Sequence, residues 1–173
     1  MKKLSFVILS SIALFSACQP KVDIEKEKAA IQDVIRQEVN AFITKDMDKF
    51  VSFYVQDESN TRLQQSCSVE YPIITGWINV KSFLEPMMNR FGTEVTNVKN
   101  SKEDFIIKVK GDCAWVVNKD VWSYEDNGKP VQGTAIQTTF MEKIDGNWKI
   151  SLLSHFSRGQ SSDESKDTTA IKR

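Results

Sequence analysis

The chain has 173 residues, of which 40% are hydrophobic and 27% are charged. Its 23 lysines and arginines balance its 23 aspartates and glutamates, so the sequence lacks the basic excess of nucleic-acid-binding proteins, and we expect no nucleic-acid partner. This length suits one domain with one hydrophobic core, to which ten phenylalanines and four tryptophans contribute large apolar surfaces.

The N-terminal sequence MKKLSFVILSSIALFSACQP is typical of a secretory signal. Two lysines precede an apolar stretch of about twelve residues, which is shorter than the roughly 20 residues that cross a bilayer as a helix. Small side chains, Ser16 and Ala17, then precede Cys18. This order resembles the signal of bacterial lipoproteins, in which the cysteine is acylated. An ordinary secretion signal or an uncleaved anchor is the alternative.

The lipoprotein resemblance implies where in the cell the protein is located. Residues 1–17 would be the signal peptide, Cys18 would carry the lipid, and residues 18–23 would form a short tether. We therefore expect the protein in the bacterial cell envelope, anchored to a membrane on the periplasmic or outer-membrane side. Several acyl chains on one cysteine would hold it firmly, at about 0.8 kcal/mol for each buried CH₂ group.

Helices are predicted in the first half of the remaining chain. Asp23 is a suitable N-cap for a helix that runs to about Thr44, and Asp46 is a suitable N-cap for a second helix along KDMDKFVSFY. A short strand is expected at residues 61–65. A third helix follows along INVKSFLEPMMNRFG, which Pro86 should kink or split.

Strands are predicted from residue 94 onward. The segments EDFIIKVKG, DCAWVVNKDVWSYE, VQGTAIQTTFMEKI and WKISLLSHFS alternate in polarity, and EDNGKP and DGN provide hairpin turns. The tail, residues 159–173, lacks apolar content and is expected to be disordered. Helices followed by an antiparallel meander indicate an α+β fold. A curved antiparallel sheet covered by helices forms a cone with a ligand cavity at its wide end.

Three segments resemble the nuclear transport factor 2-like superfamily, in particular its SnoaL-like domains. VNAFITKDMDKFVSFYVQD resembles their first two helices, and GWINVKSFLEPMMNRF resembles their third helix. The stretch from GDCAWVV to LLSHFS resembles their last three strands. The resemblance spans roughly residues 28–158. It implies a domain at residues 24–158, built as a cone of about three N-terminal helices on a curved antiparallel sheet.

The superfamily contains enzymes, such as ketosteroid isomerase-like and polyketide cyclase-like members, together with binding and assembly modules. The fold therefore does not decide the activity. One departure from the family pattern is visible, because the distance from Trp148 to His155 is one residue longer than the pattern implies. A β-bulge could absorb the extra residue.

Glu38 interrupts the apolar stripe of the first predicted helix. At about 100° per residue, Ile31, Ile35 and Phe42 share one face, and Glu38 lies one turn from Phe42. A carboxylate there must be paired, hydrogen-bonded or protonated, because burial of a lone charge is costly. Glu38 is either an acid, base or ligand contact inside the cavity, or half of a structural pair, or a group that reaches solvent at the mouth.

The family resemblance adds a partner for Glu38. Aligned without gaps on Asp46 and Tyr54, Glu38 takes the place of the oxyanion-hole tyrosine of ketosteroid isomerase-like members, and Arg62 takes the place of their catalytic aspartate. An arginine cannot act as a base near neutral pH, so that isomerisation is not implied. We expect Glu38 and Arg62 to form an ion pair across the cavity, either structural or holding a ligand's carboxylate or amide.

His155 is the only histidine in the chain. It is a candidate general acid or base, or else a sheet histidine hydrogen-bonded to the backbone. No cysteine or histidine cluster surrounds it in the sequence, so we expect no metal site and no cofactor. No motif marks a nucleophilic serine.

The strand around Trp115 has two distinct faces. Trp115, Val117 and Val121 share one face, and the other mixes polar and aromatic side chains, as a cavity wall or a partly solvated core face would. The sequence does not decide which face meets the helices. The face left over is a candidate homodimer surface, because proteins with this fold often pair sheet against sheet. The candidate ligand-binding residues are Glu38, Tyr54, Arg62, Trp77, Asn118, Asp120, Trp122 and His155.

Two cysteines remain if Cys18 is lipidated. Cys67 and Cys113 would lie in an oxidising compartment, where they form either a disulfide or two free, buried thiols.

The leading functional hypothesis is a lipid-anchored cell-envelope protein whose SnoaL-like domain binds a small, partly apolar ligand or serves as an interaction module, without catalysis. One alternative is an isomerase, cyclase, dehydratase or hydrolase that uses Glu38 or His155 as an acid–base group. The other is a dimeric assembly subunit, for which a filled cone and an apolar outer sheet are expected.

Overall fold

The computed structural model describes residues 22–66 and 73–157. The expected signal peptide, Cys18, Cys67 and the tail at residues 159–173 lie outside these residues. The helices are α1 (Ile24–Thr44), α2 (Met47–Ser52) and α3 (Trp77–Asn89). The strands are β1 (Thr61–Ser66), β2 (Ile74–Thr75), β3 (Val95–Lys110), β4 (Cys113–Asp126), β5 (Lys129–Ile144) and β6 (Asn147–Ser157). None of the helices in this part of the chain is long and apolar enough to cross a bilayer.

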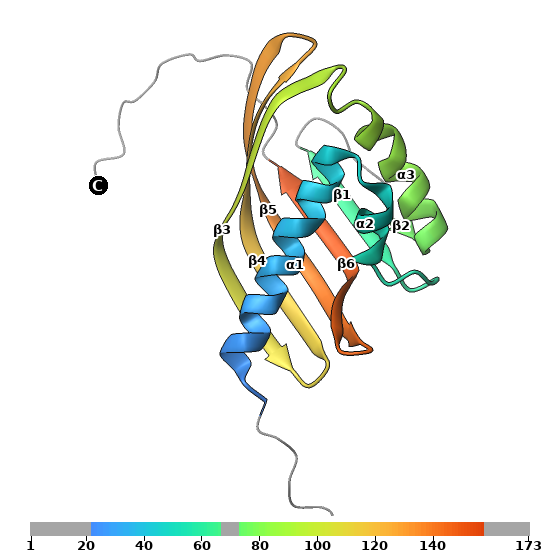
Figure 1. Ribbon diagram of the computed structural model, residues 1–173, viewed down its shortest axis with the longest axis vertical. Helices are drawn as coiled ribbons and strands as arrows, with labels where there is room; N and C mark the ends of the chain where they lie inside the picture. Colours follow the sequence, from blue (N-terminus) through green and yellow to red (C-terminus); the bar gives the residue numbers. More distant parts are fainter. Residues whose placement is uncertain (1–21, 67–72, 158–173) are drawn as a thin grey trace, which may run out of the picture.

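The described strands form one six-stranded sheet in the order β2-β1-β6-β5-β4-β3 (Figure 1). Strands β3 to β6 form the antiparallel meander that the sequence predicts. The expectation of a wholly antiparallel sheet is wrong at one edge, because β1 pairs in parallel with β6. The connection between β1 and β6 includes β2, α3 and the strands β3 to β5, and a connection of this length allows parallel pairing.

Helix α1 lies across one face of the sheet, and α2 and α3 cover the part near β1 and β2 (Figure 1). The Asp23 side chain accepts a 3.2 Å hydrogen bond from the backbone N–H of Lys26, which confirms it as the N-cap of α1. Lys45 ends the helix in the left-handed conformation, with φ of 59°. Asp46 then caps α2 through a 3.1 Å bond from the Lys49 N–H, so the predicted corner is present.

The sequence predicts that Pro86 kinks or splits α3, and the predicted split is wrong. The helix is continuous from Trp77 to Asn89 with Pro86 inside it. A proline leaves the carbonyl four residues earlier without its helical donor, which is here the carbonyl of Ser82. Both Pro86 and Ser82 are exposed, so water can satisfy that carbonyl, while Leu84 and Met88 hold the opposite side of the helix in the core.

The β4–β5 hairpin turns at Asn127 and Gly128, as predicted. Their φ values are 49° and 76°, and positive φ at both central residues matches the twist of two-residue hairpins. The core lies between the helices and the inner face of the sheet. Its largest fully buried side chains include Phe50, Ile31, Ile35, Met88, Met141 and Ile150.

The outer face of the sheet carries large apolar side chains that no described element covers. Trp115, Ile136, Phe140 and Phe156 are each between 40% and 47% exposed. They form two cross-strand pairs on this face, Trp115 with Phe140 across β4 and β5, and Ile136 with Phe156 across β5 and β6. The face that meets the helices is therefore the one that contains Asn118, Asp120 and Trp122.

Candidate functional site

A cavity of about 300 Å³ lies between the helices and the inner face of the sheet. Its wall combines apolar side chains, such as those of Phe42, Leu84 and Trp122, with ionisable groups. The acidic and basic lining residues are Glu38 on α1, Arg62 on β1, Arg90 after α3, Lys102 on β3, Asp120 and Asp126 on β4, and His155 on β6. A predominantly apolar pocket with a few polar groups is the usual form of a small-molecule site.

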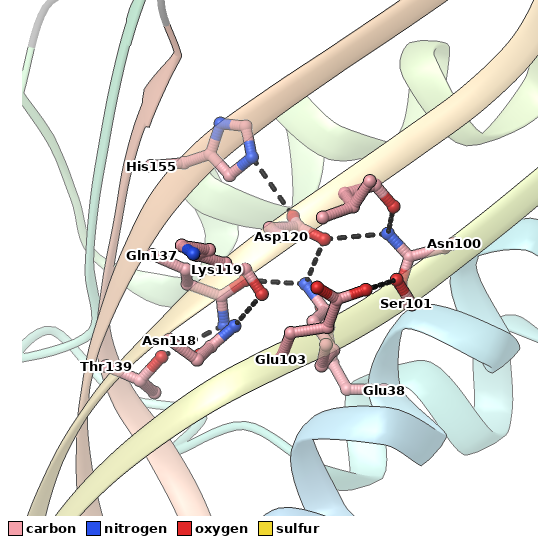
Figure 2. Close-up of polar contacts among 12 residues, drawn as sticks. Glu38, Asn100, Ser101, Glu103, Asn118, Lys119, Asp120, Gln137, Thr139 and His155 are labelled. Carbon is pink, nitrogen blue, oxygen red and sulfur yellow. Dashed lines mark hydrogen bonds and ion pairs between the residues drawn. The ribbon is translucent and has the colours of Figure 1, made fainter.

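Asp120 is the centre of the polar contacts in this cavity (Figure 2). It is 2% exposed and lies in the middle of β4. Its Oδ1 atom accepts a 2.7 Å hydrogen bond from Asn100 Nδ2 and lies 2.9 Å from Lys102 Nζ. Its Oδ2 atom lies 3.1 Å from Nε2 of His155. The two carboxylate oxygens therefore have separate partners.

The surroundings of Asp120 favour its charged form. Burial alone would raise the pKa of this carboxyl group. The contacts with His155, Lys102 and Asn100 act in the opposite direction and together hold the pKa of Asp120 well below its usual range. Asp120 is thus a carboxylate throughout the physiological pH range.

Lys102 extends the network toward the core. Its side chain is 3% exposed, and its Nζ donates a 2.7 Å hydrogen bond to Oε1 of Gln137. Gln137 in turn donates a 3.1 Å bond from Nε2 to Oγ1 of Thr139. Every nitrogen and oxygen in this chain of contacts has a partner, which is the condition under which buried polar groups are tolerated.

A bulge in β3 turns Lys102 inward. Glu103 pairs with Lys119 and Ile106 pairs with Val117, so two residues of β3, Asp104 and Phe105, stand opposite the single residue Asn118 of β4. Asp104, within this bulge, has φ of 52°. Without the extra residue the strict alternation of a strand would point Lys102 to the outer face.

A second bulge turns His155 inward, and this confirms the bulge expected between Trp148 and His155. Met141 pairs with Ile150 while Phe140 pairs with Leu152, so Ser151 is the extra residue on β6. Alternation resumes beyond the bulge, which places Leu153 and His155 in the cavity wall. Two bulges on separate strands therefore aim Lys102 and His155 at the same carboxylate.

Glu38 is paired inside the fold and lines the cavity at the same time. It is 7% exposed, and its Oε1 atom accepts a 2.6 Å hydrogen bond from the Tyr54 hydroxyl. The Tyr54 ring stacks on Trp77 with 5.2 Å between ring centroids. Burial and the nearby Glu38 charge raise the pKa of Tyr54 well above its usual value, although Arg62 opposes the shift.

The expected ion pair between Glu38 and Arg62 is absent from the described residues. Both side chains line the cavity, but Glu38 contacts Tyr54, and Arg62 Nε donates a 3.3 Å hydrogen bond to Oε1 of Gln64. The Tyr54 hydroxyl is the direct partner of the buried carboxylate, and the guanidinium of Arg62 interacts with the same tyrosine. The prediction failed because hydrophobic periodicity places Tyr54 on the second helix without showing where its hydroxyl points.

The remaining candidate residues divide between the cavity and its surroundings. Trp122 lines the cavity, whereas Tyr54 and Trp77 are buried behind Glu38. Asn118 is also outside the cavity lining, and it is 1% exposed, with its Nδ2 bonded to the Lys119 carbonyl. Cys113 is exposed rather than buried. Since Cys67 is outside the described residues, the disulfide stays a prediction.

Sequence reasoning missed Asn100, Lys102 and Gln137. Asn100 and Lys102 belong to the polar run NVKNSKED, in which the sequence does not mark either residue as inward-facing. Only knowledge of the bulge in β3 would have placed Lys102 in the cavity wall. Gln137 lies in the predicted strand VQGTAIQTTF. It shares one face of this strand with Ala135 and Thr139, because the three residues are two positions apart, and this face is the inner one. Within the described ranges there is no group of three or more histidine, cysteine or acidic residues arranged to hold a metal ion.

The model of the SnoaL-like domain family matches residues 31–158. The chain belongs to this family. No curated protein matches it in sequence. The solved structures that resemble this SnoaL-like domain share its fold at low sequence identity, and a likeness at this level is evidence for the fold alone.

Three such structures illustrate the sequence identities and TM-scores of these matches. A proposed dehydratase of the NTF2-like family from Streptomyces avermitilis is 13% identical with a TM-score of 0.66, over 77% of this chain and 96% of its own. LinA is 13% identical with a TM-score of 0.67, over 86% and 97%. An NTF2-like protein with a cystatin-like fold from Novosphingobium aromaticivorans is 10% identical with a TM-score of 0.63, over 78% and 83%.

Proposed function

We propose that this SnoaL-like domain binds a small, partly apolar molecule in its cavity and moves a proton on that molecule with His155. The observation that supports this is the 3.1 Å contact between His155 Nε2 and the buried, ionised Asp120. A carboxylate that accepts the Nε2 proton leaves Nδ1 as the basic nitrogen. The His155 side chain is 19% exposed, within a cavity wall where a ligand can reach it.

This proposal favours the enzymatic alternative over binding without catalysis. A plain binding site needs hydrogen-bond partners for its ligand but has no need of a histidine held by a buried carboxylate. General bases are commonly histidines that a second group orients. The named structural neighbour that is a proposed dehydratase is compatible with this reading, because dehydration and isomerisation both begin with removal of a proton beside an electron-withdrawing group.

The cavity restricts the ligand. Its volume of about 300 Å³ lies at the lower end of the usual range for small-molecule sites. Phe42, Leu84 and Trp122 supply apolar contacts, and Arg62 supplies a cationic group to a carboxylate or amide on the ligand. We therefore propose a compact carbonyl compound with one apolar portion as the ligand class.

The test has two stages. Native mass spectrometry of protein purified gently from its host should reveal a retained small molecule. That molecule is then incubated in D₂O with the wild-type protein and with His155→Gln. The wild-type protein should catalyse deuterium incorporation at carbon, and the variant should bind the molecule but lose at least about 100-fold of the exchange rate. Equal exchange rates for the two proteins would exclude His155 as the base.

We also propose that Cys18 carries a lipid that holds the domain at the surface of a cell-envelope membrane. Helix α1 begins close to this cysteine in sequence. The cavity residues on α1, Glu38 to Phe42, lie at least 14 residues further on, which is about 20 Å along a helix. The cavity would then stand clear of the bilayer. Cys18→Ser should move the protein from the membrane fraction to the soluble fraction and abolish labelling by a fatty-acid analogue.

A second copy of the chain is the proposed partner of the outer sheet face. The observation that favours it is the group of exposed apolar side chains that contains Trp115, Ile136, Phe140 and Phe156. Large apolar side chains exposed on one face often mark interaction sites. The sheet face and the cavity are on opposite sides of the sheet, so dimerisation and ligand binding are compatible.

A further inference from the structure

Lys102 occupies a position that packing alone does not explain. Lysine side chains are seldom fully buried, and burial of an ion pair usually gains little stability over an apolar pair of similar volume. Lys102 is nevertheless enclosed, with Nζ 2.9 Å from Asp120 Oδ1 and 2.7 Å from Gln137 Oε1. Asn100 already donates a hydrogen bond to the same Oδ1 atom, so the carboxylate does not need the lysine as a hydrogen-bond donor.

The two carboxylate oxygens of Asp120 have different partners. Oδ1 contacts Lys102 and Asn100, while the contact of Oδ2 within the described part of the chain is with His155. The carboxylate therefore orients the imidazole through Oδ2 while its charge is compensated at Oδ1. A buried aspartate without a counter-charge would favour the imidazolium form of His155, and an imidazolium cannot accept a proton.

The other charged groups around His155 do not provide this compensation. Glu38 on α1 and Arg62 on β1 line the same cavity with opposite charges. Arg90, which follows α3, lies 2.8 Å from Asp126 of β4 and also binds Glu94. The strand neighbours of His155 in register are Gln64 and Gln137, which are neutral. Lys102 is thus the cation that shares a carboxylate with the histidine.

We propose that Lys102 is a positioning residue that keeps His155 neutral and in the tautomer whose Nδ1 is basic, by cancelling the charge of Asp120. This inference rests on the proposed role of His155 as a base, but it concerns the state of the histidine in the protein without ligand. It can therefore be tested without knowledge of the substrate.

His155 is the only histidine in the chain, so ¹⁵N-histidine labelling gives one pair of ring-nitrogen signals. In the wild-type protein at neutral pH these signals should show a protonated Nε2 and an unprotonated Nδ1. In Lys102→Met the titration midpoint of His155 should move to higher pH by about one unit. Lys102→Arg, which keeps the charge, should retain a midpoint close to that of the wild-type protein.

Loss of the lysine could unfold the protein, so Lys102→Gln is a second neutral variant that can still hydrogen-bond to Asp120 and Gln137. An unchanged or lowered midpoint in a folded neutral variant would overturn the proposal. The wild-type spectrum alone would also overturn it by showing Nδ1 protonated or an imidazolium at neutral pH. These outcomes differ from failure of the proposed function, in which His155→Gln leaves the deuterium exchange rate unchanged whatever the spectra show.

Discussion

The hydroxyl group of Tyr54 donates a 2.6 Å hydrogen bond to Oε1 of Glu38, and both side chains are buried. This contact explains a carboxylate in the apolar stripe of α1. Glu38 lies one turn from Ile35 and Phe42, where a leucine would fit by periodicity, and the tyrosine supplies the donor that makes its burial tolerable. Tyr54 lies just after α2 and pairs with Ile150 of β6. Its contact with Glu38 therefore joins α1 to the segment that follows α2 and helps to fix the corner between the two helices.

Tyr54→Phe should lower the free energy of unfolding by about 1–3 kcal/mol, because it leaves a buried acceptor without its donor. The ring contacts with Phe50 and Trp77 are kept in this variant, so the loss reports the hydroxyl group. Urea denaturation at neutral pH measures it. Glu38→Gln, which keeps an acceptor for the hydroxyl, is the matched control and should lose less. Equal stability of Tyr54→Phe and the wild-type protein would show that the bond is unimportant.

The same tyrosine predicts a loss of stability at alkaline pH. Burial and Glu38 raise the pKa of Tyr54 in the folded protein, whereas in the unfolded chain the phenol ionises at about pH 10. The folded form therefore holds the proton more tightly, and its stability falls as the pH rises above about 10, by up to about 1.4 kcal/mol per pH unit. Denaturation curves between pH 8 and 11 should show this fall in the wild-type protein and a smaller one in Tyr54→Phe.

The sequence predicted the elements around this pair but not the pair itself. The N-caps Asp23 and Asp46, the strand near Thr61 and the Asn127–Gly128 hairpin all follow from local rules, and the structure confirms them. Cap and turn preferences depend on nearby residues only, which makes them readable from one sequence. The parallel pairing of β1 with β6 and the partner of Glu38 depend on contacts between distant segments.

Asp120→Asn should destabilise the protein by about 3–5 kcal/mol at neutral pH, because it leaves the buried ammonium of Lys102 without a counter-charge. Asp104→Asn is the matched control, since its partner Lys119 and the aspartate are both exposed, and exposed pairs contribute at most about 1 kcal/mol. Chemical denaturation of both variants measures the difference. Similar small losses in both would mean that the buried network carries little stability.

Protonation of Asp120 should destabilise the folded protein at acidic pH. Its pKa is lowered in the folded protein by His155, Lys102 and Asn100 against the effect of burial. A lowered pKa contributes stability above the unfolded value of about 3.9, and this contribution is lost as the pH falls below it. The wild-type protein should therefore lose stability below about pH 4, and Asp120→Asn should show a flatter profile over the same range.

This network marks the limit of what the sequence could predict about the site. Asp120 and His155 were candidates because their residue types and strand positions suggested a cavity wall. Lys102 was not a candidate, because a lysine in a polar run is ordinarily a solvated side chain. Its inward direction results from an extra residue in β3, and a bulge is set by pairing with β4 rather than by the local sequence.

Glu27 connects the first turn of α1 to the far end of the sheet. Its Oε1 atom lies 2.7 Å from Lys143 Nζ, and its Oε2 atom accepts a 2.7 Å hydrogen bond from Trp148 Nε1. Both contacts lower the pKa of Glu27, and the hydrogen bond with Lys143 has the larger effect. Glu27→Gln should cost about 1–2 kcal/mol by urea denaturation, and Glu25→Gln, whose Lys28 partner is on the surface, should cost less than about 0.5 kcal/mol. Equal costs would contradict a special role for Glu27.

The exposed apolar side chains of the outer sheet face predict a dimer that single charges should disrupt. Ile136 lies beside Phe156 on this face, and a lysine in its place would bring a charge into the interface without a partner. Light scattering coupled to size-exclusion chromatography should give the mass of two chains for the wild-type protein and of one chain for Ile136→Lys. Ile78→Lys is the matched control, because Ile78 is 74% exposed on α3 and away from the sheet face. The control should remain dimeric. A wild-type protein that stays monomeric at all concentrations, or a control that dissociates as readily as Ile136→Lys, would show that this face is not where two copies meet.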